Sequence, residues 1–264
     1  MTYGGQSLSD LYRMSLLERA IIGAAFLPII VLAQEPSRVL ELPVNNRTSD
    51  LIADQVAIQA VPAGESCISY IVSNQGSKTV LGYGITAGTS TAYQEFLPPV
   101  HPGLTSGSAD RERRLVVAGA SPQQLRQQTF SISAVIFSDG TAEGDPDAIK
   151  DLITLRQGRL LAHDRMQPVL NSLSVTIQTA GVRAITDAVS GIRNLPESND
   201  AGMPASGRLL SGMRDSYGEL IYELQSILDN HLSADMQRLA VSRILARQQA
   251  TQTQIQKYLE LARK

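Results

Sequence analysis

The stretch Phe130–Asp147, FSISAVIFSDGTAEGDPD, contains the point at which the pattern of apolar residues in this chain changes. Its first half alternates apolar and polar side chains, which predicts a strand whose one buried face carries Phe130, Ile132, Ala134 and Ile136. An Asp-Gly turn signal follows this strand. Strand-like segments precede the stretch and helix-like segments follow it, so the stretch marks the boundary between two parts of the fold.

The second half of the stretch predicts the start of a helix. Asp145 is the expected N-cap, because a carboxylate at this position accepts hydrogen bonds from free backbone N–H groups of the first turn. Pro146 suits the first helical position, where its missing N–H removes no helical hydrogen bond. Asp147 adds an acid that complements the positive end of the helix dipole.

Six or seven short strands separated by turn signals are predicted before this boundary. The strongest pair, Cys67–Asn74 and Thr79–Thr86, flanks Gln75-Gly76-Ser77 and predicts a β-hairpin. The section Ala87–Arg111 predicts a long loop with only a brief strand at Tyr93–Leu97. This pattern favours an immunoglobulin-like antiparallel sandwich, without the Cys-Trp-Cys core of antibody domains because the chain has no Trp.

After the boundary the apolar residues recur at helical spacing, in helices broken or kinked near Pro168. Narrow apolar seams are expected on these helices, including Val182, Ile185, Val189 and Ile192. The seams have two interpretations: they pack within the chain, on each other or on the sandwich, or they pair with another chain. Helical stripes are usually core, which favours packing within the chain.

The prediction is therefore an α+β fold in three parts. Residues 1–33 are a signal peptide, 34–144 a β-sandwich domain, and 145–264 a helical region with a linker near 196–207. The linker is expected from the Pro, Gly and Ser content of Pro196–Gly207, and Ser233 is the expected cap of the last helix.

The signal peptide is predicted from Ala20–Ala33, AIIGAAFLPIIVLA, an uncharged run of fourteen residues. The run is too short to span a bilayer comfortably, and Arg13 and Arg19 supply the positive flank of a leader. The small residue Ala33 predicts cleavage before Gln34 and a periplasmic or secreted mature protein. The alternative is an uncleaved N-terminal anchor, so membrane association is expected only through an uncleaved leader.

Charge and cysteine content narrow the function classes. The net charge is −2 and the basic residues are scattered, which gives no reason to expect nucleic-acid binding. Cys67 is the only cysteine, so no intramolecular disulfide forms. A buried thiol within a strand is expected, and an intermolecular disulfide is the alternative.

Acidic residues stand at alternate positions of Asp139–Lys150, a pattern that is also found in metal sites. A weak calcium candidate consists of Asp139, Glu143, Asp145 and Asp147. The spacing matches the start of an EF-hand loop, but Lys150 stands where a bidentate glutamate should close the calcium shell, and a strand precedes the loop. A strand exit followed by a helix cap explains these residues better, so no metal site is assigned.

The sequence contains no recognisable catalytic motif. Gly82–Ala87 matches the loose dinucleotide pattern G-x-G-x-x-A, but its glycines fall inside a strand pattern and indicate a bulge or close sheet packing. The three histidines, His101, His163 and His231, are far apart in the sequence. No catalytic residue, cofactor-binding residue or cofactor is therefore assigned.

Two stretches, Ser69–Thr86 and Ile132–Arg165, resemble uncharacterised exported bacterial proteins. In those proteins a sandwich strand ends in a V-F-x-D-G-T-x-x-G-D turn and leads into a helix containing R-x-G-R. The matching residues here are Phe137, Asp139, Gly140, Thr141, Gly144, Asp145, Arg156, Gly158 and Arg159. The resemblance implies export and an immunoglobulin-like sandwich followed by helices, and it implies no activity and no functional residues.

These observations predict a non-catalytic exported bacterial protein that acts through protein contacts in the periplasm or cell envelope. Its partner would be an unknown protein, or a second copy bound through the helical region. The alternative is an exported hydrolase whose site is built from loop 87–111, since long loops often carry function.

Overall fold

The computed structural model describes residues 40–42, 44–45, 48–60, 66–97, 103–117, 120–198 and 207–262 of the 264-residue chain. The predicted signal peptide, His101 and most of the predicted linker lie outside these residues. The chain from Leu40 to Lys264 forms one compact unit. It has an α+β fold with antiparallel sheets, as the sequence predicted at this level.

The strands form two four-stranded antiparallel sheets. The order in the first sheet is β1 (Leu40–Glu41), β2 (Leu51–Ala60), β3 (Ser66–Asn74) and β6 (Arg113–Val117). The order in the second sheet is β5 (Ser90–Glu95), β4 (Val80–Ala87), β7 (Phe130–Phe137) and β8 (Ala142–Gly144). A short helix, α2 (Pro122–Leu125), precedes β7, with Ser121 and Gln124 forming a capping box.

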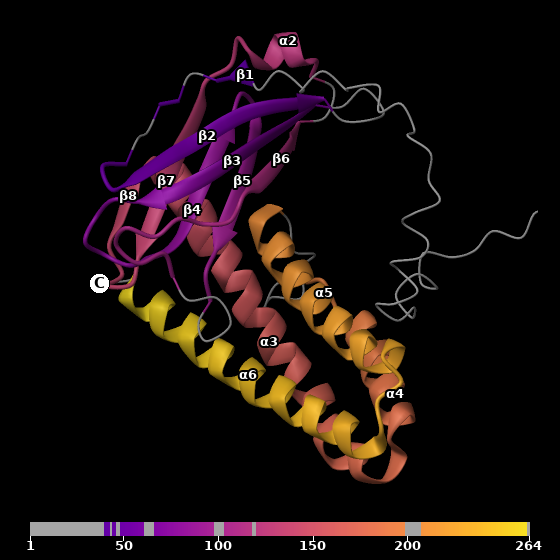
Figure 1. Cartoon of the computed structure of the whole chain (residues 1–264). Coiled ribbons are helices and arrows are strands. Elements are labelled where there is room, and N and C mark those ends of the chain that lie inside the picture. The colour runs from indigo at the N-terminus through magenta and orange to yellow at the C-terminus, as the bar shows by residue number, and fades with distance from the viewer. Residues whose placement is uncertain are drawn as a thin grey trace, which may run out of the picture. The chain divides into compact units, whose positions relative to one another are not determined.

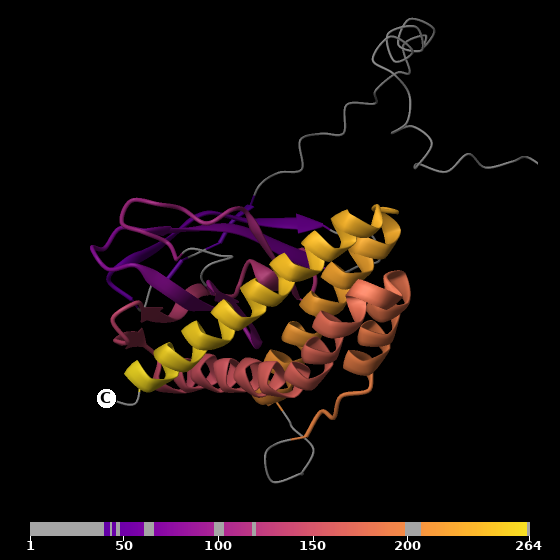
Figure 2. The ribbon, with the colours of Figure 1, turned by 90° about the horizontal axis from the view of Figure 1, so that it is seen from below.

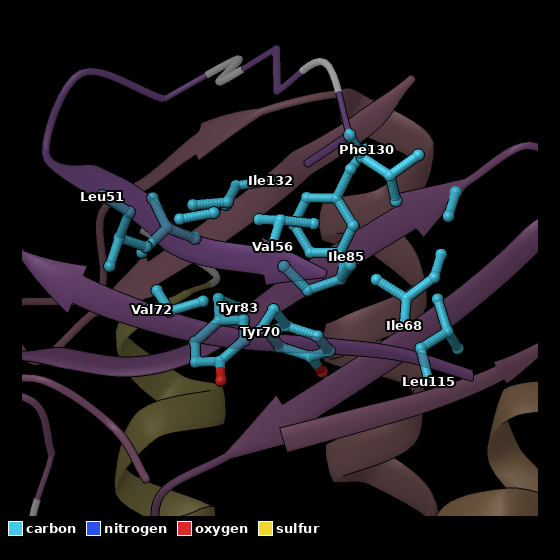
Figure 3. Packing of buried hydrophobic residues seen from close by; sticks show 14 of the residues in the cluster. Leu51, Val56, Ile68, Tyr70, Val72, Tyr83, Ile85, Leu115, Phe130 and Ile132 are labelled. Carbon is cyan, nitrogen blue, oxygen red and sulfur yellow. The ribbon is translucent and has the colours of Figure 1, made fainter. Parts of the chain in front are cut away.

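The two sheets face each other across a shared apolar core (Figures 1 and 3). The ring centroids of Tyr70 and Phe130 lie 5.2 Å apart across this core, and those of Tyr83 and Phe96 lie 6.0 Å apart within it. Figure 3 shows the hydroxyl groups of Tyr70 and Tyr83 leaving the core in the same direction. The Tyr83 hydroxyl donates to Asp110 Oδ2 at 2.7 Å, so this buried tyrosine keeps a hydrogen bond.

The predicted hairpin between Cys67–Asn74 and Thr79–Thr86 is wrong. β3 pairs with β2 and β6, and β4 pairs with β5 and β7, so the connection crosses from one sheet to the other. Both edges of β3 and both edges of β4 are therefore already paired with other strands, so β3 and β4 cannot pair with each other. Asn74 stabilises the crossing: its Nδ2 donates to the carbonyls of Lys78 and Leu104 at 2.8 Å, and its Oδ1 accepts from the Gly76 N–H at 3.0 Å.

β4 instead forms a hairpin with β5, and the turn and second strand of this hairpin lie within Ala87–Arg111, the section predicted as a loop with a strand only at Tyr93–Leu97. β5 begins at Ser90, and Ala87 faces Ser90 across a turn that contains Gly88. Gly88 has φ +58°, a conformation that costs glycine little and other residues more. The wrong prediction followed from the weak apolar pattern of β5, an edge strand of the second sheet.

The sequence predicted that buried and exposed side chains alternate along β7. This prediction is wrong, because all eight residues of the strand are buried. Ile132 faces Ile85 and Ala134 faces Gly84, so Ser133 is an extra residue that forms a β-bulge. The bulge reverses which side chains face the core between the sheets. Phe130 and Ile132 face this core, whereas Ala134 and Ile136 point to the other face and pack against helix α3.

Helix α3 (Pro146–Ala180) begins as predicted, with Asp145 as N-cap and Pro146 in the first turn. The helices were predicted to be broken or kinked near Pro168; the break is wrong, since α3 continues through this residue. Pro168 is exposed, and the neighbouring Met166 and Leu170 are buried in the helical core. Packing of these flanking side chains compensates for the hydrogen bond that proline cannot make.

The remaining helices are α4 (Val182–Arg193), α5 (Gly207–Asp229) and α6 (Ala234–Leu261), the last capped by Ser233 as predicted. They pack on α3 around a common apolar core, and α4 lies at the end away from the strands (Figures 1 and 2). Of the predicted seam, Ile185, Val189 and Ile192 are buried there and Val182 is 52% exposed.

The helical region also packs on the strands. Ala148 and Leu152 of α3 contact the second sheet, and Ile255 and Leu259 of α6 pack on Leu97. The structure therefore supports the interpretation in which the helical seams pack within the chain. Within the described ranges no helix combines the length and apolar character needed to cross a bilayer.

Candidate functional site

A cavity of about 610 Å³ lies where β5 and the start of β6 meet helices α3, α5 and α6. Its volume falls within the range of small-molecule sites in proteins. We call it the charged pocket, because more than half of its lining residues are charged. These are Glu95, Arg111, Arg113, Arg159, Arg214, Asp215, Glu219, Glu223 and Arg247.

The base of the charged pocket is a buried ion cluster around Glu95, the last residue of β5. Arg156 Nε donates to Glu95 Oε1 at 2.6 Å, and Arg159 Nε lies 2.9 Å from Oε2. The two arginines are three residues apart on α3, so they project from the same face of the helix. The side chains of Glu95 and Arg156 are only 2% and 1% exposed, which makes their pairing essential to their burial.

Two glycines make this arrangement possible. Gly158 of α3 lies against the backbone of Leu209, and Gly212 of α5 lies against the backbone of Leu155. A Cβ atom at either glycine would overlap the facing backbone, so α3 and α5 approach each other closely only because both positions lack a side chain. This close approach places the pocket-lining residues of α5 beside Arg159.

The wall formed by α5 is acidic and is only partly neutralised. Asp215, Glu219 and Glu223 recur every four residues and share one face of the helix. Arg159 lies 3.1 Å from Asp215 and 3.3 Å from Glu219, and Arg247 of α6 pairs with Glu223. Burial raises the pKa of Asp215 and of Glu223, and the neighbouring arginines offset part of this effect.

The opposite wall is basic and comes from the segment that leads into β6. Arg113 binds Asp110 with two hydrogen bonds of 2.9 and 3.1 Å, while Asp110 also accepts from Tyr83. Arg111 is exposed, and its guanidinium makes no ion pair with any residue that the structure describes. Arg214 lines the pocket as well and forms a paired contact with Glu197.

Three buried polar side chains complete the lining: His163, Ser216 and Gln248. Burial, with a smaller contribution from Arg159, lowers the pKa of His163 to about 4, so the imidazole is neutral at pH 7. Among the described residues, Ser216 Oγ and Gln248 Oε1 have no hydrogen-bond partner. Buried polar atoms of this kind are usually satisfied, so these two leave room for a water molecule or a ligand in the pocket.

The acidic side chains considered as calcium ligands bind other groups of the protein. Asp139 accepts hydrogen bonds from the backbone and hydroxyl of Thr141 and pairs with Lys78 at 3.0 Å. These contacts lower the pKa of Asp139 to about 2. Glu143 accepts from the Ser49 hydroxyl at 3.0 Å.

The other two candidates, Asp145 and Asp147, belong to the start of α3. Asp145 Oδ1 accepts from the Asp147 N–H at 2.9 Å and from the Ala148 N–H at 3.3 Å. Asp147 lies in the first turn. Across the described ranges, no three or more His, Cys, Asp or Glu side chains are grouped so as to hold a metal ion.

The other residues singled out in the sequence are the glycines of Gly82–Ala87, Cys67 and the histidines. Gly82 and Gly84 lie inside β4 as predicted, at positions where the register with β7 shifts. Gly84 faces Ser133 and Tyr93 so closely that a Cβ atom would displace them, which confirms close sheet packing. Cys67 is 3% exposed and is a free thiol, as expected for a buried strand residue. Of the two histidines that the structure describes, His163 lines the charged pocket and His231 does not.

The residues on which the predicted resemblance rests have structural roles in this chain. Gly140 adopts φ +88° in the turn after β7, close to Leu261 of α6, and the Asp145 N–H donates to the bulged Ser133 carbonyl at 2.7 Å. In R-x-G-R, the arginines hold Glu95 and the glycine admits α5.

Sequence reasoning missed the charged pocket. The available signal was that Arg156 falls on the apolar stripe of α3, four residues after the buried Leu152, where a charge requires a buried partner. Glu95 gave a similar signal, since it directly precedes the apolar pair Phe96 and Leu97.

Comparison with protein-family models, with curated proteins and with solved structures finds no match to this chain.

Proposed function

We propose that this chain is an exported, non-catalytic binding protein that acts through protein contacts in the periplasm or cell envelope. The leader pattern of Ala20–Ala33 supports export, and the two facing sheets support an immunoglobulin-like sandwich. The helical seams are buried within the chain, so a partner is expected at the charged pocket and not along these seams.

The charged pocket is the observation that carries this proposal. Its charges come from strands and from three helices, and they are largely paired with each other at 2.6–3.3 Å around a buried base. Such paired side chains are held in place before a partner arrives, which lowers the entropic cost of binding. Charge complementarity at the mouth of the pocket would then select a charged segment of the partner protein.

A pull-down from an envelope extract tests this function with the full chain as bait and chemical crosslinking to retain weak partners. Arg111→Glu reverses the unpaired charge at the mouth of the pocket, whereas Arg183→Glu makes the same change on α4, where the side chain is 86% exposed. We expect one partner that the wild-type chain and Arg183→Glu capture equally and that Arg111→Glu loses. Equal capture by all three proteins would refute the pocket as the binding surface.

A second candidate function is an exported hydrolase, and one observation favours it. The pocket that holds the neutral His163 and the unpartnered Ser216 is also lined by residues of the segment predicted as a site loop, namely Tyr93, Gln94, Glu95, Leu97 and Arg111. A neutral imidazole is the form that acts as a general base. A screen for esterase, glycosidase and peptidase activity separates the two functions. Turnover that both Ser216→Ala and His163→Gln abolish would replace the binding function with the hydrolase.

A further inference from the structure

The two walls of the charged pocket carry opposite surplus charges. On the side of the helices and the pocket base, four carboxylates share three guanidinium groups in ion pairs. The carboxylates are Glu95, Asp215, Glu219 and Glu223, and the guanidinium groups are Arg156, Arg159 and Arg247. Arg159 alone contacts three of the carboxylates, so one negative charge on this wall remains uncompensated.

The surplus is located at Asp215 and Glu219. Arg156 offsets Glu95, and Arg247 offsets Glu223, which leaves the single guanidinium of Arg159 for the remaining two carboxylates. The carboxyl group of Asp215 has a raised pKa because burial and the neighbouring Glu219 disfavour its charge, which Arg159 only partly restores. A cationic group placed here would relieve this repulsion.

The strand wall has the reverse imbalance. Asp110 offsets Arg113, while Arg111 has no carboxylate partner among the described residues. Arg214 lies on α5 and is offset by Glu197, so it does not change the balance of the helix wall. A guanidinium presents a planar set of donors that suits a carboxylate. The pocket therefore offers a free cationic group on one wall and a surplus anionic group on the other.

Unsatisfied polar atoms also line the pocket. Ser216 follows Asp215 on α5 and is 2% exposed, and Gln248 of α6 is 8% exposed. Within the described part of the chain, Ser216 Oγ and Gln248 Oε1 have no hydrogen-bond partner, and Arg159 Nε and Glu95 Oε2 contact each other without the alignment of a hydrogen bond. A ligand in the cavity could use this unmet capacity, because buried polar atoms without partners are costly.

We infer that the charged pocket binds a small zwitterion, an amino acid or short peptide, with its ammonium group at Asp215 and Glu219 and its carboxylate at Arg111. The cavity of about 610 Å³ is large enough for such a molecule. Charge-assisted hydrogen bonds at both ends would fix its orientation. The inference shares the pocket with the proposed function and needs no partner protein, so each can fail without the other.

The experiment is isothermal titration calorimetry of the full chain with the twenty free amino acids and a set of unblocked dipeptides that includes alanyl-alanine. The tightest ligand is then compared with its N-acetylated form and its C-terminal amide. We expect binding by an unblocked ligand and at least a tenfold loss of affinity when either end is blocked. Absence of binding at about 10 mM across the panel, or equal affinity for blocked and unblocked forms, overturns the inference.

Variants assign each end of the ligand. Arg111→Gln should weaken binding of the unblocked ligand at least tenfold and leave the affinity for its C-terminal amide unchanged, because that form lacks the carboxylate. Glu219→Gln should behave in the same way toward the N-acetylated form. Arg183→Gln, on the exposed face of α4, is the matched control and should bind like the wild type. Losses that do not depend on which end is blocked would overturn the assignment.

Discussion

Glu95 shows why single residues at the base of the charged pocket matter to stability. Its carboxylate compensates two arginines whose side chains are 1% and 12% exposed. Removing one partner of a buried ion cluster leaves the other charges in a medium that solvates them poorly. The cluster is therefore expected to be far more sensitive to substitution than the ion pairs at the surface.

We predict that Glu95→Ala lowers the free energy of unfolding by about 3–5 kcal/mol, the usual cost of leaving a buried charge unpaired. Asp187→Ala is the control, because it removes an exposed pair with Arg183 and should change stability by less than about 0.5 kcal/mol. Urea unfolding followed by circular dichroism measures both variants. Equal effects of the two substitutions would show that the Glu95 cluster is not desolvated in solution.

His163 gives a second prediction at this scale. Its pKa falls from 6.5 to about 4 on folding, so between these pH values the unfolded chain binds more protons than the folded chain. Stability should thus decrease as the pH falls from 6.5 to 4, by roughly 3 kcal/mol in total for this group. His163→Leu should remove that part of the pH dependence. Unfolding free energies at pH 7.5 and 4.5 test it, and an unchanged difference between these pH values in the variant would contradict the assignment.

At the scale of elements, the contact between α3 and α5 depends on glycine. Gly158→Ala and Gly212→Ala would each press a methyl group into the facing backbone, and we expect each to destabilise the protein by about 2 kcal/mol or more. Gly218→Ala is a matched control on α5, since its Cβ would meet no atom within 4 Å. It should stabilise the helix by up to about 1 kcal/mol. Thermal unfolding distinguishes the two outcomes, and a gain of stability in all three variants would contradict the close packing of α3 on α5, because helix propensity alone favours alanine.

The start of α3 provides a prediction about a cap. Asp145→Ala removes the acceptor for the N–H groups of Asp147 and Ala148 and should lower the free energy of unfolding by about 1 kcal/mol, while Asp145→Asn should retain most of the stability.

The melting temperature of the wild-type chain should be the same with added calcium and with a chelator, because the acidic side chains already bind protein groups. A rise in melting temperature with calcium would restore the metal site.

Features of these elements that depend on residues close together in the chain were predictable from the sequence, and features that depend on distant residues were not. The N-cap at Asp145 and the cap at Ser233 were predictable, because capping depends on residues within one turn. The partners of β3 and β4 were not, since strand pairing joins residues that are distant in the chain and a turn signal does not distinguish a hairpin from a crossing between sheets. The bulge at Ser133 escaped for a similar reason, as an inserted residue changes the faces without changing the composition.

The charged pocket was hidden from sequence reasoning because it is assembled over long separations. Glu95 and Arg156 are 61 positions apart, and Arg159 and Asp215 are 56 apart. No motif brings such residues together. An arginine at a core position of a helix was nevertheless a usable signal, since it requires a buried acid elsewhere in the chain.

At the scale of the whole molecule, the strands and helices should unfold together. Ala134 and Ile136 of β7 are covered by Ala148 and Leu152 of α3, and Glu95 of β5 has its partners on the same helix. Separated strands would expose an apolar sheet face and a carboxylate without counter-charge. We therefore predict that a chain ending at Gly144 shows no cooperative thermal transition.

Hydrogen exchange on the intact chain tests the same coupling without truncation. Amides of β7 and α3 should exchange with one common free energy of opening, because the two elements share a buried interface. Leu152→Ala should lower the protection of both elements equally, by about 2–5 kcal/mol. Val175→Ala, at a side chain of α3 that is 72% exposed, should leave both unchanged. Loss of protection in α3 alone would mean that the strands fold independently of the helices, and the sheets would then be a separate domain.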